Sequence, residues 1–222
     1  MADDLPTLNG PISEPRSGGR PKQVVLMLHG VGADGNDLIG LAPFFQEILP
    51  DAVFISPHAP FRFEMAPVGY QWFSIGNFDP ERRIKGVRQA EPILNAYIDT
   101  VLSSLGLKEK DLALLGFSQG TMMALHVGLR REKPVAGILG FSGMLAGPET
   151  LPSEIKSRPP VMLIHGDADN VLPVAALAEA AKGLEACKVP VEHHVRPGLA
   201  HGIDEQGIRL GQTFLGRIFG KV

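Results

Sequence analysis

The stretch Gly116-Phe117-Ser118-Gln119-Gly120 divides a predicted strand from a predicted helix. Residues 112–117 form a short, continuous apolar run, which is typical of a strand buried on both faces. Residues 119–131 follow a helical pattern. Glycines on both sides of the serine leave room for the strand and the helix to approach each other through a sharp turn. We therefore expect the hydroxyl of Ser118 to stand clear of the backbone at the end of a strand, where it could act as a nucleophile.

The same alternation of strand and helix patterns extends over the rest of the chain. Further apolar runs predict strands at residues 24–28, 52–56, 135–141 and 161–165, and a more polar run predicts one at 191–196. Helical patterns lie between them at residues 37–49, 84–105, 174–186 and 203–219. This alternation predicts an α/β fold with a mainly parallel central sheet and helices on both faces. In such sheets sites form at the carboxyl ends of the strands, so the residues just after each strand carry the most information on function.

Length and composition narrow the classes of protein to consider. The chain has 222 residues, which is enough for one sizeable core and short for two domains. Proline and glycine are frequent in residues 1–22, so we expect a flexible N-terminal tail there and a single domain over residues 23–222. The formal charge is −3, which leaves no basic surplus for nucleic acid or an anionic membrane.

Location and metal content can also be predicted. No run approaches the ~20 apolar residues that span a bilayer, so no stable membrane insertion is expected. The acidic N-terminus lacks the pattern of a secretory signal, which favours a cytoplasmic location. The single cysteine, Cys187, excludes an internal disulfide and a Cys-based metal cluster, and we expect no metal site.

A serine hydroxyl is a weak nucleophile at neutral pH and needs a base, usually a histidine that a carboxylate holds in place. Asp167 and Asp169 follow the predicted strand at 161–165. Asp169 is farther along the loop and is the favoured carboxylate, whereas Asp167 is expected to tie the turn through its own backbone amides. His201 lies in a glycine-flanked loop after the strand at 191–196 and is the favoured base.

Other residues compete for these roles. Ser142 also ends a predicted strand, but no glycine stands two places after it, so we expect it to shape a strand end or the pocket floor. The remaining histidines that the patterns place on strands, helices or loops are expected to be structural: His58, His126, His165, His193 and His194.

Acyl transfer also needs hydrogen-bond donors for the oxyanion. The amide of Gln119 is one candidate, and the amide of Val31, in the glycine-rich loop after the first main strand, is the other. Gly30, Gly32 and Gly35 also satisfy the spacing of a dinucleotide-binding loop. That alternative is disfavoured because no acidic residue ends a second strand at the usual distance.

Residues 57–83 interrupt the alternation and form a long loop that is rich in aromatic residues. The loop packs as structure, or it also lines an acyl pocket. The candidate pocket residues from this loop and from the loop that carries Asp169 are Phe63, Met65, Trp72, Phe73, Val171 and Leu172. Phe61, Tyr70 and Phe78 complete the aromatic set of the long loop.

Taken together, these residues resemble the phospholipase/carboxylesterase family of α/β-hydrolases, which includes the acyl-protein thioesterases and small bacterial carboxylesterases. The matching motifs run in family order from about residue 23 to the C-terminus: Leu28-His29-Gly30-Val31-Gly32, Pro57-His58-Ala59-Pro60, Trp72-Phe73, Gly116-Phe117-Ser118-Gln119-Gly120, Phe141-Ser142-Gly143, His165-Gly166-Asp167-Ala168-Asp169-Asn170-Val171-Leu172-Pro173 and Gly198-Leu199-Ala200-His201. The resemblance implies an α/β-hydrolase fold with no large lid domain. It also implies a triad of Ser118, Asp169 and His201, oxyanion donors at Val31 and Gln119, no cofactor, and a possible homodimer.

These expectations lead to a serine carboxylesterase that hydrolyses short- to medium-chain esters of small molecules through an acyl-enzyme. An acyl-protein thioesterase or a lysophospholipase is the nearest alternative, since the same groups open those bonds, and a peptidase would share the triad. A different class also stays open: a catalytically silent binding protein with a hydrolase fold.

Overall fold

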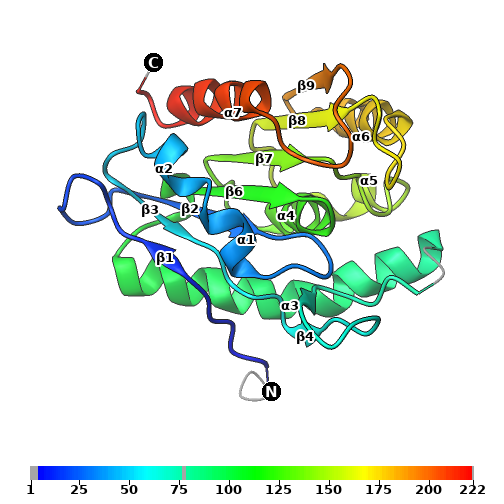
Figure 1. The fold of residues 1–222 in the computed structure, drawn as a ribbon, viewed down its shortest axis with the longest axis horizontal. Coiled ribbons are helices and arrows are strands. Elements are labelled where there is room, and N and C mark those ends of the chain that lie inside the picture. Colours follow the sequence, from blue (N-terminus) through cyan, green and yellow to red (C-terminus); the bar gives the residue numbers. More distant parts are fainter. Residues whose placement is uncertain (1–4, 77–78, 222) are drawn as a thin grey trace.

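The computed structural model describes residues 5–76 and 79–221, so Phe78 of the expected aromatic set lies outside the described residues. Its main feature is a seven-stranded sheet in the order β1-β3-β2-β6-β7-β8-β9 (Figure 1). All neighbours pair in parallel except β1 and β3. The strands are β1 (Ile12–Ser13), β2 (Gln23–Leu28), β3 (Ala52–Ile55), β6 (Leu112–Phe117), β7 (Gly137–Phe141), β8 (Val161–Gly166) and β9 (Val191–Arg196). This sheet confirms the predicted α/β architecture.

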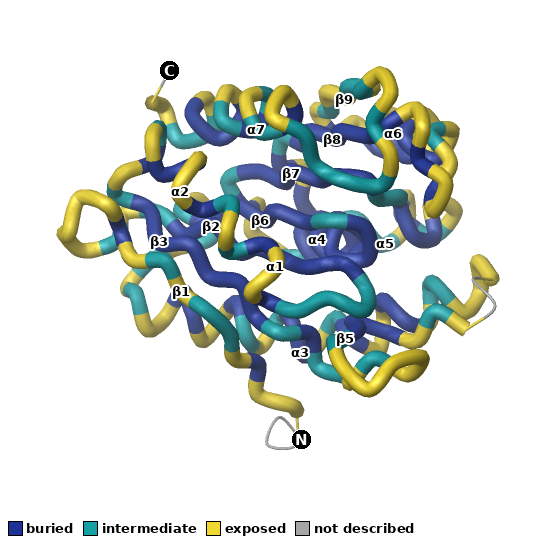
Figure 2. The backbone as a smooth tube through the Cα atoms, viewed as in Figure 1, coloured by how far each residue is buried: buried dark blue, intermediate teal, exposed yellow. Residues whose placement is uncertain are grey.

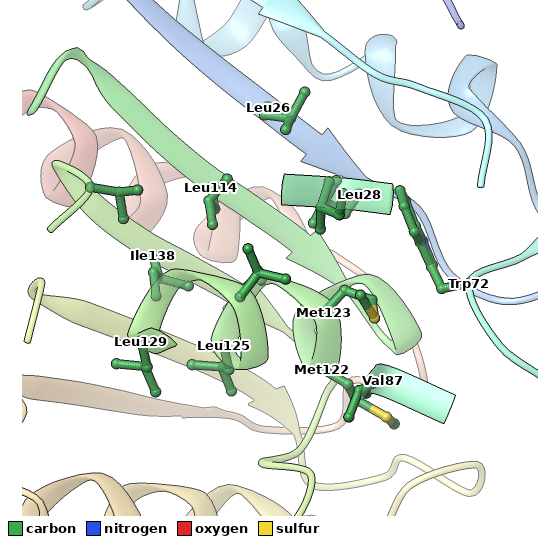
Figure 3. Close-up of a cluster of buried hydrophobic side chains, with 14 of the residues drawn as sticks. Leu26, Leu28, Trp72, Val87, Leu114, Met122, Met123, Leu125, Leu129 and Ile138 are labelled. Carbon is green, nitrogen blue, oxygen red and sulfur yellow. The ribbon is translucent and has the colours of Figure 1, made fainter. Parts of the chain in front are cut away.

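Helices cover both faces of the sheet because its central strands are apolar on both sides. In β2, Val24, Leu26 and Leu28 face one core, while Val25 and Met27 face the other. The first core packs against α3 (Pro80–Leu105), α4 (Gln119–Arg130) and α6 (Ala175–Ala186), and Figure 3 shows part of it. The second packs against α1 (Gly35–Ile39), α2 (Ala42–Phe45) and α7 (Glu205–Ile218). Figure 2 shows the resulting buried centre and exposed outer loops.

Two short helices replace the single helix expected at residues 37–49. The first, α1, ends at Ile39 with Gly40 as its C-cap, and α2 has Pro43 in its first turn. Proline fits the first turn of a helix but cannot donate the hydrogen bond that would continue α1. The helical pattern was interpreted as one helix, and the break at Gly40 and Pro43 was not predicted. The remaining short elements are α5 (Leu151–Glu154) and the 3₁₀ turn Glu109–Asp111.

Residues 5–22 differ from the flexible tail expected over residues 1–22. Ile12 and Ser13 form β1, which pairs antiparallel with Ile55 and Phe54 of β3. Leu8 is buried in the first core. A strand of two residues is too short to show an alternation of apolar and polar side chains, and the frequent prolines around it favour the prediction of a loop. The segment therefore completes one edge of the sheet, although its composition predicts a loose lead-in.

The long loop after β3 contains a second, two-stranded sheet, made of β4 (Phe61–Arg62) and β5 (Tyr70–Gln71). The backbone of Tyr70 pairs with the loop after β2: its carbonyl accepts from the Gly32 amide at 2.8 Å, and its amide donates to the Ala33 carbonyl at 2.8 Å. No helix within residues 5–76 and 79–221 is both long and apolar enough to cross a membrane.

The strand order places a site between β2 and β6. From β2 the chain moves outward to β3, then returns through α3 to β6 on the other side of β2. The loops that leave β2 and β6 at their carboxyl ends therefore diverge to opposite faces, which opens a crevice between them. Ser118 follows β6 and the glycine-rich loop follows β2, so the fold brings both to this crevice.

Candidate active site

Ser118 occupies the turn between β6 and α4 with φ 53° and ψ −115°. This backbone conformation is strained for a residue with a side chain. Two glycines permit it, because a Cβ on Gly120 would collide with the carbonyl oxygen of Leu28, and a Cβ on Gly116 would collide with the start of α4. The Ser118 amide donates to the Phe141 carbonyl at 2.9 Å, which ties the turn to β7. The expected sharp turn is thus present, with Ser118 at the N-terminus of α4.

Two backbone amides lie free beside this turn. Among the described residues, neither the amide of Val31 nor that of Gln119 has a hydrogen-bond acceptor. Val31 precedes Gly32, whose φ of +81° turns the loop, and Gln119 begins α4. The residues of both amides line the cavity that Ser118 also lines. Free amides at a helix N-terminus and a glycine turn form a place where negative charge is stabilised.

His29 connects the loop after β2 to the start of the long loop through its ring nitrogens. It is fully buried, its Nδ1 lies 2.7 Å from the Gly30 carbonyl, and its Nε2 accepts from the Ala59 amide at 2.9 Å. Because Nε2 accepts, the ring is neutral with its proton on Nδ1. Burial lowers the pKa of His29 below its ordinary value, which is consistent with that neutral form. Sequence reasoning treated His29 only as a neighbour of the glycine loop.

The side chain of Gln119 joins the turn to the long loop. Its Oε1 accepts from the Trp72 amide at 2.7 Å, and its Nε2 donates to the Phe73 carbonyl at 2.8 Å. Trp72 adds a third contact, because its indole N–H donates to the His29 carbonyl at 2.9 Å. The three contacts fix the long loop against the strand ends. This positioning role of Gln119 was not expected, since the sequence analysis considered only its amide.

Asp169 and His201 form a direct pair at the ends of β8 and β9. Nδ1 of His201 lies 2.7 Å from Oδ2 of Asp169, and Oδ1 accepts from the amides of Val171 and Leu172 at 2.8 and 2.9 Å. Burial raises the pKa of Asp169, but the hydrogen bonds from His201 and those two amides outweigh it, so the pKa is below its ordinary value. An ionised carboxylate accepts the Nδ1 proton, which leaves Nε2 of the neutral imidazole without one. Asp169 therefore fixes the orientation of the His201 ring and leaves Nε2 able to accept a proton.

A second histidine shares this carboxylate. Nε2 of His165 lies 3.1 Å from Oδ2 of Asp169 and 2.9 Å from the Leu172 carbonyl, while its buried Nδ1 has no partner among the described residues. With the proton on Nε2, the neutral ring places a donor beside the acid. His165 was expected to be structural. Its place at the end of β8, four residues ahead of Asp169, is the signal that could have indicated this contact.

Further contacts brace the loop that carries His201. The Ser142 hydroxyl donates to the Gly202 carbonyl at 3.2 Å, and Oδ1 of Asp167 accepts from the Gly198 amide at 2.6 Å. Asp167 therefore links two loops, whereas the sequence predicted a bond within its own turn. The Phe117 ring lies 5.0 Å from the imidazole of His201 between centroids. Among the described residues no hydrogen bond joins the Ser118 hydroxyl to His201, although their strand ends are brought to one edge of the sheet.

A cavity of about 160 Å³ lies beside Ser118. Of the expected pocket residues, Phe73, Val171 and Leu172 line it. The other three do not line this cavity. Met65 is 71% exposed, and Trp72 is fully buried in the core beside Leu28, as Figure 3 shows. The ring of Phe63 packs near Gly32 instead.

Three further residues that line this cavity were not expected as pocket residues. Val31 was expected only as an amide donor, and Ile75 and Met122 had no predicted role at the site. Met122 is the fourth residue of α4, so its position one turn beyond Ser118 was a readable signal. Ile75 follows an irregular loop, which no periodicity predicts. Among the described residues, no group of three or more histidine, cysteine or acidic side chains is placed to hold a metal ion.

The chain is similar in sequence to known proteins that are named as esterases and thioesterases. The family model described as Phospholipase/Carboxylesterase matches residues 12–218. Esterase YpfH of Escherichia coli K12 is 28% identical over 198 residues, covering 87% of this chain and 82% of the relative. Acyl-protein thioesterase 1 of Saccharomyces cerevisiae is 29% identical over 194 residues, covering 81% and 86%.

A solved structure supports the same assignment. The crystal structure of esterase PE8 superimposes with a TM-score of 0.91 at 39% identity and covers 96% of this chain and 99% of that one. The similarity therefore extends over nearly the whole chain. With the α/β-hydrolase fold, the strained Ser118 turn and a family match over residues 12–218, this chain belongs to the phospholipase/carboxylesterase family.

Proposed function

We propose that this chain is a serine carboxylesterase that hydrolyses short- to medium-chain esters of small molecules, with Ser118, Asp169 and His201 as its catalytic residues. The observation that carries the proposal is the 2.7 Å contact between Asp169 and His201 at the same sheet edge as the strained Ser118 turn. A carboxylate, an imidazole and a serine at three strand ends are the groups that acyl transfer requires.

The first half of the reaction forms an ester with the enzyme. Ser118 Oγ attacks the substrate carbonyl carbon, and its proton passes to Nε2 of His201. The oxyanion accepts hydrogen bonds from the free amides of Val31 and Gln119. The tetrahedral intermediate then collapses, the bond to the alcohol oxygen breaks, and His201 protonates the departing alcohol. A hydrogen bond from Ser118 to His201 would form when substrate binds, since such contacts often tighten only in the complex.

The second half repeats the sequence with water. His201 takes a proton from a water molecule that attacks the acyl carbon. The second tetrahedral intermediate releases the carboxylic acid, and the proton returns to Ser118. Asp169 stays ionised throughout and stabilises the imidazolium that forms twice in each cycle.

The size of the cavity favours a short acyl group. Drug-sized ligand pockets span about 300–1,000 Å³. The space beside Ser118 is about 160 Å³ and its walls are apolar. We therefore expect hydrolysis to be fastest for butyrate or hexanoate esters and to decline for long chains. Initial rates across a series of p-nitrophenyl esters measure this preference.

The decisive experiment replaces Ser118 by alanine. We expect Ser118→Ala to abolish turnover of p-nitrophenyl butyrate and to abolish covalent labelling by a fluorophosphonate probe, while circular dichroism shows an unchanged fold. Ser142→Ala is the control and should keep labelling. Labelling of Ser118 excludes a catalytically silent binding protein, whereas an unlabelled, folded wild type would support one.

Acyl-protein thioesterase activity is the second candidate, because a relative of 29% identity carries that name. The same three residues would open a thioester, with a thiol as the leaving group. Comparing kcat/KM for butyryl esters and butyryl thioesters separates the two. The cytoplasmic location and the possible homodimer stay predictions from the sequence.

A further inference from the structure

A second cleft, of about 340 Å³, is bordered by His201 and shares no lining residue with the Ser118 cavity. It is formed by α1 and the residues that follow it, by the end of β6, and by the loop between β9 and α7. Ser118 lines only the first cavity, and His201 lines only the second. The lining residues of the second cleft are Asp37, Leu38, Leu41, Phe117, His201, Gly202 and Ile203.

The stereochemistry of the proposed reaction assigns the two cavities different parts of the substrate. In the tetrahedral intermediate the carbonyl carbon bonds to Ser118 Oγ, the oxyanion, the acyl chain and the leaving group. The oxyanion lies at the amides of Val31 and Gln119, whose residues border the first cavity together with apolar side chains. The leaving oxygen must receive its proton from His201, so the leaving group lies on the imidazole side. The second cleft, bordered by His201, is therefore the place for the alcohol.

The side chains that line the second cleft are mostly apolar, and one of them carries a charge. Leu38, Leu41 and Ile203 supply aliphatic walls, and Phe117 supplies an aromatic ring. Asp37 is its one carboxylate, and no lysine or arginine lines it. The side chain of Asp37 is exposed and has no hydrogen bond or ion pair to any described residue. The negative charges of Asp34 and Asp37 both act on the buried ring of His29. Each raises the pKa of His29, although burial lowers it by more.

We propose that Asp37 makes this cleft select leaving groups that carry a positive charge, such as an alcohol with an ammonium group a few carbons from its oxygen. The carboxylate pairs with the cation, and the Phe117 ring offers its face to the same group. The aliphatic walls contact the intervening carbons. This inference rests on the proposed serine esterase activity and adds the class of alcohol that it releases.

The test compares two butyrate esters of the same shape, butyrylcholine and 3,3-dimethylbutyl butyrate. The acyl group is identical, and the two alcohols differ at one atom, which is a positively charged quaternary nitrogen in choline and a neutral quaternary carbon in 3,3-dimethylbutanol. The readout is the ratio of kcat/KM for the charged ester to that for the neutral ester. We expect Asp37→Asn to lower this ratio about two- to fivefold at low ionic strength, the range of an exposed ion pair, with the neutral ester unaffected. Charge reversal in Asp37→Lys should lower the ratio further.

A matched control separates a local contact from net charge. Glu185 is an exposed carboxylate on α6, and it lines neither the cavity nor the cleft. Glu185→Gln should leave the ratio unchanged, and high salt should shrink the difference between wild type and Asp37→Asn. An unchanged ratio in Asp37→Asn, or an equal drop in Glu185→Gln, overturns the inference while ester turnover stands. Loss of turnover of both esters together with no labelling of Ser118 would instead defeat the proposed function, and the inference with it.

A further pair of substrates identifies the source of the cation. S-butyryl peptides with lysines or with serines beside the acylated cysteine carry the charge on a peptide instead of a small alcohol. Dependence on Asp37 in the choline pair alone assigns the cleft to small amino alcohols. Dependence in the peptide pair alone would overturn that assignment.

Discussion

The turn around Ser118 and the loop around His201 are built in opposite ways. The turn, residues 116–120, is set by its own backbone, because glycines on both sides permit a close approach that no side chain allows. The loop, residues 197–203, is held by side chains from other strand ends: Asp169, Asp167 and Ser142. A local motif therefore locates the candidate nucleophile, whereas the position of the candidate base depends on contacts that no single motif encodes.

Replacing Asp169 tests the side-chain half of this comparison and should have the largest effect. Asp169→Asn cannot hold the Nδ1 proton of His201 in the same way, so the base loses its orientation. We expect kcat/KM for p-nitrophenyl butyrate to fall about a thousandfold to ten-thousandfold. Asp167→Asn is the neighbour control, since an amide oxygen can still accept from Gly198. A larger loss in Asp167→Asn than in Asp169→Asn would exchange the roles of the two aspartates.

Replacing Gly120 tests the backbone half. A Cβ there meets the carbonyl oxygen of Leu28, so β2 and α4 must separate. We expect Gly120→Ala to lower the free energy of unfolding by about 3 kcal/mol, measured by urea denaturation. Gly202→Ala is the matched control in the His201 loop, where a Cβ has no neighbour within 4 Å. Equal losses in the two variants would mean that the turn is not the more tightly packed region.

The Ser142 hydroxyl offers a smaller test of the His201 loop. Ser142→Ala removes its bond to the Gly202 carbonyl, which should lower kcat/KM up to about tenfold and stability by about 1 kcal/mol. Ser157→Ala removes a similar bond, 3.1 Å to the Gly128 carbonyl, away from the site. Ser157→Ala should lower the free energy of unfolding by a similar amount and leave kcat/KM unchanged. If both variants lose activity alike, Ser142 has no special part in placing the loop.

His29 gives the smallest expected effect, a pH dependence of stability. Its folded pKa is below the unfolded value near 6.5, so the unfolded state binds more protons when the pH falls below about 6.5. The contribution of His29 is therefore full above that pH and is lost as the pH falls toward the folded pKa. We expect the free energy of unfolding of His29→Gln to decline less steeply from pH 7 to pH 5 than that of the wild type. Parallel curves would show that His29 does not titrate in this window.

Long apolar strands and the glycine motif made much of the fold predictable. β6 and β9 have the predicted bounds, and four further strands lie where apolar runs predicted them. Such strands are buried on both faces, so their sequence pattern reflects their environment directly. β1 was not predicted, because two residues that pair with partners 41 and 43 positions along the chain leave no local pattern.

The candidate site was predictable where residues follow a strand, and less so elsewhere. Ser118, Asp169 and His201 each stand just beyond a strand, which is why sequence position alone suggested them. Met65 and Trp72 were assigned to a pocket because an aromatic loop near a site invites that interpretation. The exposure of Met65 and the burial of Trp72 depend on how the hairpin folds onto α4 and β2, which composition does not determine.

The side chain of Gln119 binds the long loop through main-chain atoms of that loop, the amide of Trp72 and the carbonyl of Phe73. These two hydrogen bonds do not involve the side chains of the β4–β5 hairpin. Residues at the tip of the hairpin can therefore change while the bonds remain. The segment between β4 and β5, which does not line the Ser118 cavity, can therefore vary between relatives while the long loop stays attached to the start of α4.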